Sequence, residues 1–481
     1  MRTTLFTVAV LLLAGCAVGP DYSRPDLEQP ADWRTVDSMT AAVPAVTYAD
    51  TSWWRLFGDT VLVRLIDTAL VQNNDVRIAA ARVEQYMGLY GVTRSDLFPK
   101  FGGGAGAARG QFEATGDGSV TRPTNNSFHA EVFATWELDL WGKIRRATEA
   151  ARADVLAAEE NRRGVVVSVA TLVAESYIDL LALDEKLLIA QKTLAGRERT
   201  LDLFAKRKVE GDISDLEMSM IESEYWLAKA AIPSFEAQIA RKENAINFLL
   251  GRIPGPVPRG GTISRLAVPV PPAGLPSQLL EQRPDVRFAE EQLIAANARI
   301  GVAKAQYFPS ISLTGLFGTA STDLSNLFKG SAMVWNVGGE LLQPIFRWGE
   351  ISGQVDAAVG AQKAALEAYV GSVRNAFRDA EDALVTRTKG SEQYDAERGR
   401  VNALGQYARL AGMRYDEGVT SYLEVLDAER SLFSASIDAV TTQAGVAKSA
   451  VGIYRAFGGG WVDWASMNAA MPADPVEPRE P

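Results

Sequence analysis

The 481-residue sequence contains one cysteine and one histidine, and this scarcity excludes several kinds of chemistry. A structural zinc site, a cysteine-histidine nucleophile pair and a cluster of histidine metal ligands each need several such side chains. Cys16 has no second cysteine for an intrachain disulfide. A serine-histidine-aspartate triad would have to use His129, which lies in a stretch that alternates like a strand. We therefore expect no metal and no catalytic residue, and hydrolysis by paired carboxylates remains as the enzyme alternative.

An excess of positive charge is also absent. The 49 Lys and Arg residues are outnumbered by 59 Asp and Glu residues, which gives a formal net charge of -10. Neutralising the phosphates of a nucleic acid requires a surplus of basic side chains, and no basic face is apparent. No nucleotide loop of the Walker type is present. The sequence therefore predicts neither a nucleic-acid partner nor a bound cofactor.

A long apolar run is missing after residue 16. The nearest candidate, Val165 to Leu183, contains Glu175 and Asp179, and a carboxylate at the centre of a bilayer costs roughly 2.5 to 3.5 kcal/mol. Apolar or small residues recur there at alternating spacings of three and four, with a polar interruption at Arg197. This repeat is typical of supercoiled helices, so we predict a coiled coil. Residues 143–209 contain no proline, and one helix there could reach roughly 100 Å at about 1.5 Å per residue.

The N-terminus has the pattern of an export signal. A short positive region precedes the apolar stretch Leu5 to Ala14, which is shorter than the roughly 20 residues that a membrane-spanning helix needs. The four residues Leu13 to Cys16 resemble the bacterial lipoprotein box, in which the cysteine is acylated. Because no other cysteine exists, we predict lipidation of Cys16, with a chance cysteine behind an ordinary signal peptide as the alternative. Ala17 is not the Asp that resembles an inner-membrane retention signal, so the outer membrane is the predicted destination.

The sequence is internally duplicated. A shift of 210 residues aligns Gly91-Val92 with Gly301-Val302 and Phe98-Pro99 with Phe308-Pro309, and a shift of 207 serves the rest of the repeat. The second shift aligns Trp141-Gly142 with Trp348-Gly349, Ile144 with Ile351, Arg207 with Arg414, Gly211 with Gly418, Ser214 with Ser421 and Leu216-Glu217 with Leu423-Glu424. A period this long indicates a duplicated supersecondary unit, not a short solenoid repeat.

These patterns divide the chain into six segments. They are a signal peptide (1–15), an extended N-terminal segment anchored by Cys16 (16–58), the first repeat (59–250), a proline-rich linker (251–276), the second repeat (277–461) and a disordered tail (462–481). Each repeat begins with a helical stretch, from about Val61 to Leu97 and from Ser277 to Tyr307, that ends at Phe-Pro. A β-hairpin follows (about 101–140 and 310–343), then a helical hairpin with its tip at 209–217 or 415–427.

The predicted strands have a period of two. From Phe128 to Leu140 apolar residues alternate with polar ones over about thirteen residues, and a tilted membrane strand needs about 9 to 11. Residues 311–317 and 333–341 repeat the pattern, whereas 101–112 is rich in Gly and Ala and is assigned by symmetry. Four strands cannot close a barrel in lipid, so two, three or four chains would have to share one of about eight, twelve or sixteen strands. Surface hairpins on a periplasmic helical protein are the alternative.

Several short motifs now combine into a family resemblance. Cys16 to Pro25 (CAVGPDYSRP), the two Phe-Pro helix ends, Leu140-Trp141-Gly142, the paired helix turns and Phe457 to Trp461 (FGGGW) resemble the outer-membrane efflux lipoproteins of the NodT/OprM type, relatives of TolC. The resemblance covers nearly the whole chain. It implies a fold that is mainly α with a small membrane β part: a homotrimer whose shared twelve-stranded β-barrel continues into a periplasmic α-barrel of long antiparallel coiled-coil helices.

The same resemblance implies a function and partners. Proteins of this type form the outer-membrane exit duct of a tripartite efflux pump, which passively conducts small molecules such as drugs. The implied partners are a periplasmic adaptor (membrane fusion) protein, an inner-membrane transporter that is commonly proton-driven, and outer-membrane lipid. A duct for protein (type I) secretion stays open as an alternative, as does a periplasmic coiled-coil scaffold. Neighbouring genes for a proton-driven pump or for a peptide-exporting ATPase would separate the two ducts.

Two helical turns are the predicted adaptor-docking tips. Gly211 and Gly418 can adopt the positive φ that ends one helix, and Ser214 and Ser421 are suited to cap the next. Together with Asp215, these residues would meet the helical hairpins of the adaptor. Ordinary capped turns with solvated acids are the alternative.

The gate is assigned at the same tips by resemblance. Glu424 and Asp427 match acidic ring positions and lie three apart on one helix face, while Tyr415 and Glu217 match a pair that links neighbouring hairpins in a shut channel. Rings of acids favour cations and repel one another. Thr420 departs from the Arg or Asp of relatives, so either a latch or one acidic ring is missing there.

Overall fold

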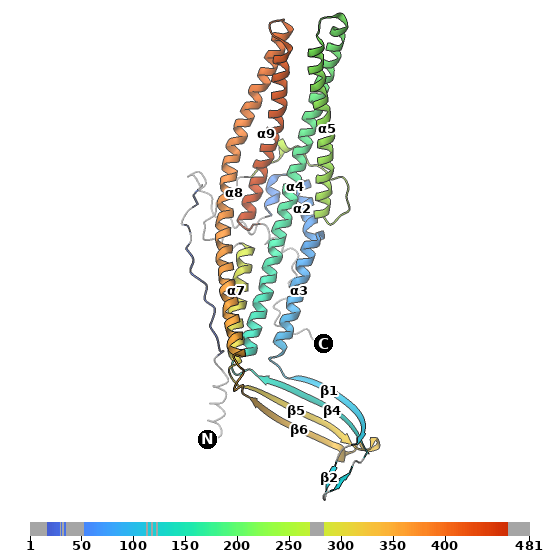
Figure 1. Ribbon diagram of the computed structural model, residues 1–481, viewed down its shortest axis with the longest axis vertical. Helices are drawn as coiled ribbons and strands as arrows, with labels where there is room; N and C mark the ends of the chain where they lie inside the picture. The colour runs from blue at the N-terminus through green and yellow to red at the C-terminus, as the bar shows by residue number, and fades with distance from the viewer. Residues whose placement is uncertain are drawn as a thin grey trace. The chain divides into compact units, whose positions relative to one another are not determined.

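Long helices make up most of the chain. The computed structural model describes residues 17–28, 30, 33–34, 52–111, 114–116, 119–121, 124–269 and 283–459, so Cys16, the signal peptide and the tail 462–481 lie outside the described residues. Figure 1 labels the helices α2 (Thr60–Gln72), α3 (Asn74–Ser95), α4 (Lys143–Glu210), α5 (Asp215–Leu249), α7 (Pro284–Ala305), α8 (Glu350–Asp416) and α9 (Tyr422–Ala456). Short 3-10 helices are η2 (Trp53–Phe57), η3 (Ile263–Arg265), η4 (Leu324–Asn326) and η5 (Gly330–Ala332).

The duplication is visible in the helix lengths. α4 and α8 have 68 and 67 residues, and α5 and α9 have 35 each. The chain forms two compact units: one holds Met1–Asp26, Arg82–Glu159 and Phe288–Val370, and the other holds Leu27–Ala81, Glu160–Arg287 and Gly371–Pro481. Each unit therefore contains matching segments of both sequence repeats, and neither repeat folds as a unit by itself.

The alternating spacing of three and four in α4 predicts its buried face. Val166, Val169, Val173 and Leu180 are all buried. One window of α4 is long and apolar enough to cross a membrane by length and composition, but 67% of it is buried inside the protein. The prediction of a packed coiled-coil helix is confirmed, because an apolar stripe of this period is covered by neighbouring helices.

The predicted helical stretch from about Val61 to Leu97 consists of two helices that meet at Asn73. Asn73 is extended (φ -61°, ψ 133°) and separates α2 from α3. Its side-chain oxygen accepts hydrogen bonds from the backbone N–H groups of Asp75 and Val76, at 2.8 and 3.2 Å, and its amide donates to the carbonyl of Leu249 at 2.8 Å. Asparagine ends helices in this way because its amide competes with the backbone for hydrogen bonds.

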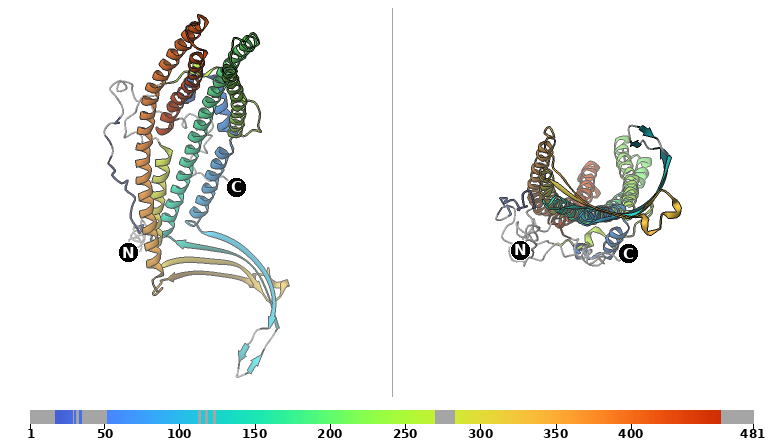
Figure 2. Two further views of the ribbon diagram at one scale, coloured as in Figure 1. Left: turned by 45° about the horizontal axis from the view of Figure 1, so that its top comes forward. Right: turned by 90° about the horizontal axis from the view of Figure 1, so that it is seen from below.

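The first-described unit contains a four-stranded antiparallel sheet in the order β1-β4-β5-β6. The strands are β1 (Lys100–Gln111), β4 (Thr124–Leu138), β5 (Ser310–Ser321) and β6 (Met333–Leu342), and a separate ribbon pairs β2 (Ala114–Gly116) with β3 (Ser119–Thr121). The four strands curve together in Figures 1 and 2. Within the described residues, β1 and β6 are edge strands with one neighbour each. The predicted fold class, mainly α with four strands per chain, is confirmed.

Candidate functional site

The first helical tip is built by local capping. Gly211 has a φ of +86°, which ends α4, and Ser214 caps α5. The Ser214 hydroxyl accepts from the backbone N–H of Glu217 at 3.2 Å, and the Glu217 carboxylate accepts from the Ser214 N–H at 3.0 Å. This reciprocal capping box satisfies two helix-end donors and uses the Glu217 side chain locally.

The second tip follows the same backbone path with different side-chain contacts. Gly418 has a φ of +72°, and Ser421 is extended at the N-cap position of α9. Ser421 thus takes the predicted N-cap position, but its hydroxyl makes no capping hydrogen bond. Glu424, which stands where Glu217 closes the first box, instead accepts from Arg414 at 3.2 Å and from the hydroxyl of Thr420.

Both predicted ring acids have a basic neighbour in the same chain. Glu424 forms an ion pair with Arg414, and Asp427 forms one with Arg430 at 3.0 Å. Thr420 is uncharged, and its hydroxyl donates a hydrogen bond to Glu424. The paired arginines offset much of the negative charge that a ring of carboxylates alone would present.

Tyr415 joins the two helical hairpins. Its hydroxyl accepts from the Arg207 guanidinium at 3.1 Å, so α8 is linked to α4. The same guanidinium lies 5.7 Å from the centre of the Phe204 ring and 6.0 Å from that of Tyr415. Within this chain, Tyr415 and Glu217 therefore bind different residues. The Tyr415 hydroxyl contacts Arg207, and the Glu217 carboxylate contacts Ser214 in the capping box.

An aromatic cluster that the sequence did not reveal lies under these polar contacts. The Phe204 and Tyr422 rings are 4.3 Å apart, and the Tyr415 and Tyr422 rings are 5.0 Å apart. Ile221 of α5 is buried in the same cluster. Burial, with Glu429 nearby, raises the pKa of Tyr422 to about 12. The one member of this cluster that the sequence pattern indicated is Phe204, the last apolar position of the repeat in α4.

The outer ends of the tips are exposed and carry both charged and apolar side chains. The carboxylate of Asp215 forms an ion pair with Lys208 at 2.7 Å, and this cation lowers the pKa of the exposed carboxyl. Apolar side chains are exposed on both tips: Val209 (89%) and Leu216 (72%) on the first, and Val419 (62%) and Leu423 (59%) on the second. Of these, Leu216 and Leu423 are equivalent in the repeat alignment. Such side chains at helix turns are suited to contact a partner protein.

Two layers of ion pairs, one buried and one partly exposed, connect α4 to its neighbours. Arg197, the interruption in the apolar repeat, is buried and contacts Glu429 of α9 at 2.6 Å and Glu224 of α5 at 3.5 Å. Asp179 contacts Lys242 of α5 at 3.2 Å and Lys448 of α9 at 2.7 Å. The charge order is inverted between the layers: α4 supplies the cation in the first layer and the anion in the second.

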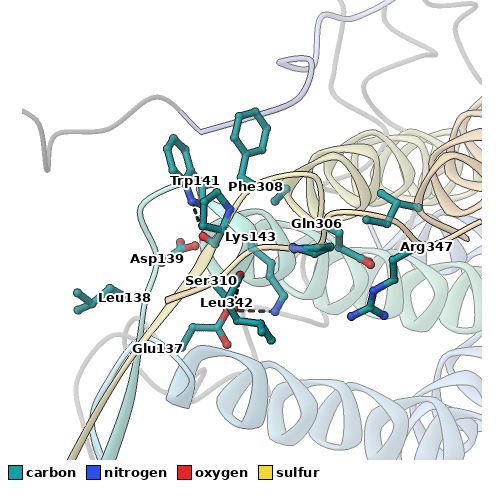
Figure 3. A pocket seen from close by; sticks show the side chains of 14 residues that line it. Glu137, Leu138, Asp139, Trp141, Lys143, Gln306, Phe308, Ser310, Leu342 and Arg347 are labelled. Atoms are coloured by element: carbon teal, nitrogen blue, oxygen red, sulfur yellow. Dashed lines mark hydrogen bonds and ion pairs between the residues drawn. The ribbon is translucent and has the colours of Figure 1, made fainter. Parts of the chain in front are cut away.

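A small cavity of about 150 Å³ lies where the strands meet the helices (Figure 3). Trp141 stacks on Phe308 at 4.8 Å and donates its indole N–H to the carbonyl of Pro309 at 2.7 Å. Glu137 is paired with Lys143 at 3.1 Å. In the described part of the chain, no group of three or more His, Cys, Asp or Glu side chains is placed to hold a metal ion.

Comparison with known proteins now decides the family. The family described as "Outer membrane efflux protein" matches residues 65–252 and 275–459, one segment in each half. The chain belongs to the outer membrane efflux protein family. The predicted family resemblance is confirmed.

Relatives of this efflux family cover the chain almost completely. The solvent efflux pump outer membrane protein SrpC of Pseudomonas putida is 36% identical over 468 residues, which is 94% of this chain and 97% of SrpC. The cation efflux system protein CusC of Escherichia coli is 35% identical over 460 residues, 95% of this chain and 98% of CusC. The two relatives are thus named for the efflux of different substances, solvents for SrpC and cations for CusC.

Solved structures show the same fold. A crystal structure of CusC superposes with a TM-score of 0.83 at 32% identity and covers 92% of this chain and all of that one (100%). The open state of the Neisseria gonorrhoeae MtrE outer membrane channel gives a TM-score of 0.84 at 33% identity, over 93% of this chain and 99% of MtrE. The efflux family and these channels place the chain in the outer membrane as a transport protein.

Proposed function

We propose that this chain is the exit duct of a tripartite efflux pump and passively conducts small molecules, such as drugs, across the outer membrane. The match of the efflux family to both halves of the chain is the observation that carries this proposal. Relatives named for solvents and for cations share the fold, which supports a duct that selects little while the pump chooses the cargo.

The duct is a homotrimer with a shared barrel. The described part of one protomer contains a four-stranded sheet with two edges, and edges exposed to lipid would leave backbone groups unpaired. Three copies give a closed barrel of twelve strands. The signal peptide 1–15 is removed, acyl chains on Cys16 hold the protein at the outer membrane, and the helices form the large periplasmic part.

The helical tips carry the gate and the docking surface. Glu217, Tyr415, Thr420, Glu424 and Asp427 form the periplasmic gate. The turns around Gly211, Ser214, Asp215, Gly418 and Ser421 receive a periplasmic adaptor, which links the duct to a proton-driven inner-membrane transporter. The exposed apolar side chains at both turns support this assignment.

Purification of the full-length protein in mild detergent tests the duct. We expect a particle with the mass of three chains that conducts ions in a planar bilayer, and a deletion strain that becomes drug-sensitive until the gene is restored. A monomer without conductance would refute the duct. Photocrosslinking from Ser214 or Ser421 should capture the adaptor, and capture from strand loops alone would contradict the docking surface.

A further inference from the structure

The four-stranded sheet has an apolar face and a polar face, because side chains alternate along each strand. Most of the exposed apolar side chains of the strands share one face: Phe101, Val132, Leu313, Phe317, Met333, Trp335, Val337 and Leu341. The opposite face carries the polar side chains His129, Glu131, Thr135, Glu137, Ser312, Thr314, Asn336 and Glu340. In the barrel of the proposed function, the apolar face meets lipid and the polar face lines the water-filled lumen.

On the lumen face, the ring of Phe133 lies against a glycine of the neighbouring strand. Phe133 of β4 is opposite Gly102 of β1, and the two strands run side by side (Figures 1 and 2). A Cβ on Gly102 would lie 2.5 Å from Cζ and 2.7 Å from Cε2 of Phe133. The far end of the ring therefore occupies the space that a side chain at this position would take. Gly102 is half-buried, whereas Phe101 and Gly103 on either side of it are exposed.

The imidazole of His129 is placed in the same way. His129 is opposite Gly106, and a Cβ on this glycine would lie 2.5 Å from Cε1 and 2.8 Å from Nε2 of the imidazole. Gly106 is again half-buried between the exposed residues Ala105 and Ala107. Two ring side chains of β4 thus bend across the sheet and cover two glycines of β1.

The glycine between these two positions is different. Gly104 lies opposite Glu131 on the same face, yet it is exposed and a Cβ there would meet nothing within 4 Å. The equivalent pairs of the second hairpin contain no glycine: they are Ser312 with Glu340 and Leu316 with Asn336. The ring-on-glycine contact is therefore a property of two particular pairs in the first hairpin.

These contacts affect how far the two rings reach into the lumen. Side chains of a strand normally stand roughly perpendicular to the sheet. A barrel of about eight strands is filled by its inward side chains, and one of about sixteen to eighteen strands leaves an aqueous channel. A barrel of twelve strands lies between these limits, so the orientation of each large inward side chain changes the width that is left for cargo.

We propose that Gly102 and Gly106 set the width of the barrel lumen, because they let the rings of Phe133 and His129 lie flat against the wall. A larger residue at either position displaces the end of the ring into the lumen, at three places per barrel. This role rests on the shared barrel of the proposed function. The same contacts shield the backbone of β1, an edge strand within the described residues, as aromatic rings do over strand glycines.

His129 is the one histidine of the chain, so its position can be tested chemically. In the full-length protein with a histidine-free affinity tag, diethyl pyrocarbonate should modify His129 slowly, because Nε2 lies against Gly106. The reaction should be several-fold faster in Gly106→Ala. Gly104→Ala adds the same methyl group to the same face two residues away and should keep the parent rate. Equal rates in the three proteins, or equal acceleration by both substitutions, would overturn the contact.

The width of the lumen is measured in planar bilayers with polyethylene glycols of graded size on the barrel side. The largest polymer that still enters the barrel, and so lowers the conductance, should be smaller for Gly102→Ala than for the parent or Gly104→Ala. Adding Phe133→Ala to Gly102→Ala should restore the parent limit, because the displaced ring is removed.

Phe133→Ala by itself should change this size limit little, since the ring already lies flat. An equal limit for Gly102→Ala and Gly104→Ala, or a large increase with Phe133→Ala alone, would overturn the proposed role in lumen width. A protein that does not conduct would refute the duct instead, and the modification rate of His129 would still decide whether its ring lies on Gly106.

Discussion

Glu424 and Asp427 differ from bare acidic rings because each lies against an arginine of its own chain. Arg414 and Arg430 make these contacts at 3.2 and 3.0 Å. The sequence placed the two acids on one helix face, since a spacing of three fixes that, but the charge balance depended on Arg414, which is ten residues away on the other helix of the hairpin. We therefore expect the cation preference of the proposed gate to be smaller than that of a ring of unpaired acids.

Removing both acids should leave two unpaired arginines per chain. We expect Glu424→Ala with Asp427→Ala to lower the cation-to-anion permeability ratio toward anion preference and to raise leak, measured by reversal potentials in salt gradients across a bilayer. Glu392→Ala with Glu397→Ala, which removes two acids of α8 that pair with Lys389 and Arg400, is the control for net charge. Unchanged ion selectivity in a verified trimer would contradict the gate assignment.

The buried hydroxyl of Tyr422 predicts a pH dependence. Its pKa is raised to about 12 in the folded protein by burial, against about 10 in an unfolded chain. A raised folded pKa gives stability that is complete below pH 10 and is lost as the pH rises from about 10 to 12, by at most about 3 kcal/mol.

Tyr422→Phe should therefore unfold with a weaker dependence on pH in that window. Denaturant unfolding and the ultraviolet absorbance of tyrosinate measure the two effects. Tyr407→Phe, which removes an exposed hydroxyl of α8, should keep the dependence of the parent. Identical pH profiles for all three proteins would exclude ionisation of Tyr422 as the cause.

At the scale of elements, α7 contains Gly301, where the close approach of another segment leaves no room for a side chain. The sequence alone did not predict this close approach. The repeat alignment pairs Gly91 with Gly301, but of these two the described N-terminal residues cross Gly301 alone. A Cβ on Gly301 would lie 2.5 Å from the carbonyl oxygen of Val18 and 2.8 Å from Cγ of Arg146, whereas one on Gly91 meets nothing within 4 Å. The segment is further held by the Arg24 guanidinium, which binds Glu290.

Gly301→Ala should destabilise this unit by about 1–3 kcal/mol, because backbone and side chain cannot both move away. The N-terminal segment should also become more accessible to limited proteolysis. Gly91→Ala is the matched variant and should be neutral or stabilise by up to about 1 kcal/mol, since alanine favours helix. Equal unfolding curves and equal cleavage of the two variants would show that the crossing at Gly301 is not tight.

Contacts with residues distant in sequence also determine which side chains of α4 are buried. Its spacing correctly predicted the buried positions, since a helix with an apolar stripe must bury it. Arg197 was expected to interrupt that stripe, yet it is buried against Glu224 and Glu429. Those partners come from α5 and α9, and no local pattern links residues that far apart in sequence.

At the scale of the whole molecule, the sequence predicts that acyl chains on Cys16 anchor the protein to the membrane. The mature protein purified from membranes should begin at Cys16 and carry the added mass of acyl chains, as measured by mass spectrometry of the N-terminal peptide. Cys16→Ala should lack this mass and be released more readily from membranes, because each buried methylene contributes about 0.8 kcal/mol to membrane binding. An unmodified Cys16 in the mature protein would contradict the prediction.

The sequence by itself determined the long helices, the alternating strands, the turns at Gly211 and Gly418 and the duplication, because each follows from short-range periodicity or backbone preference. It also determined that four strands are too few to close a barrel. Tertiary structure decided what no local pattern encodes. Matching parts of both repeats share each compact unit, Arg414 pairs with Glu424, and Trp141 packs on Phe308 while Trp348 is exposed. These outcomes depend on which distant groups the folded chain brings together.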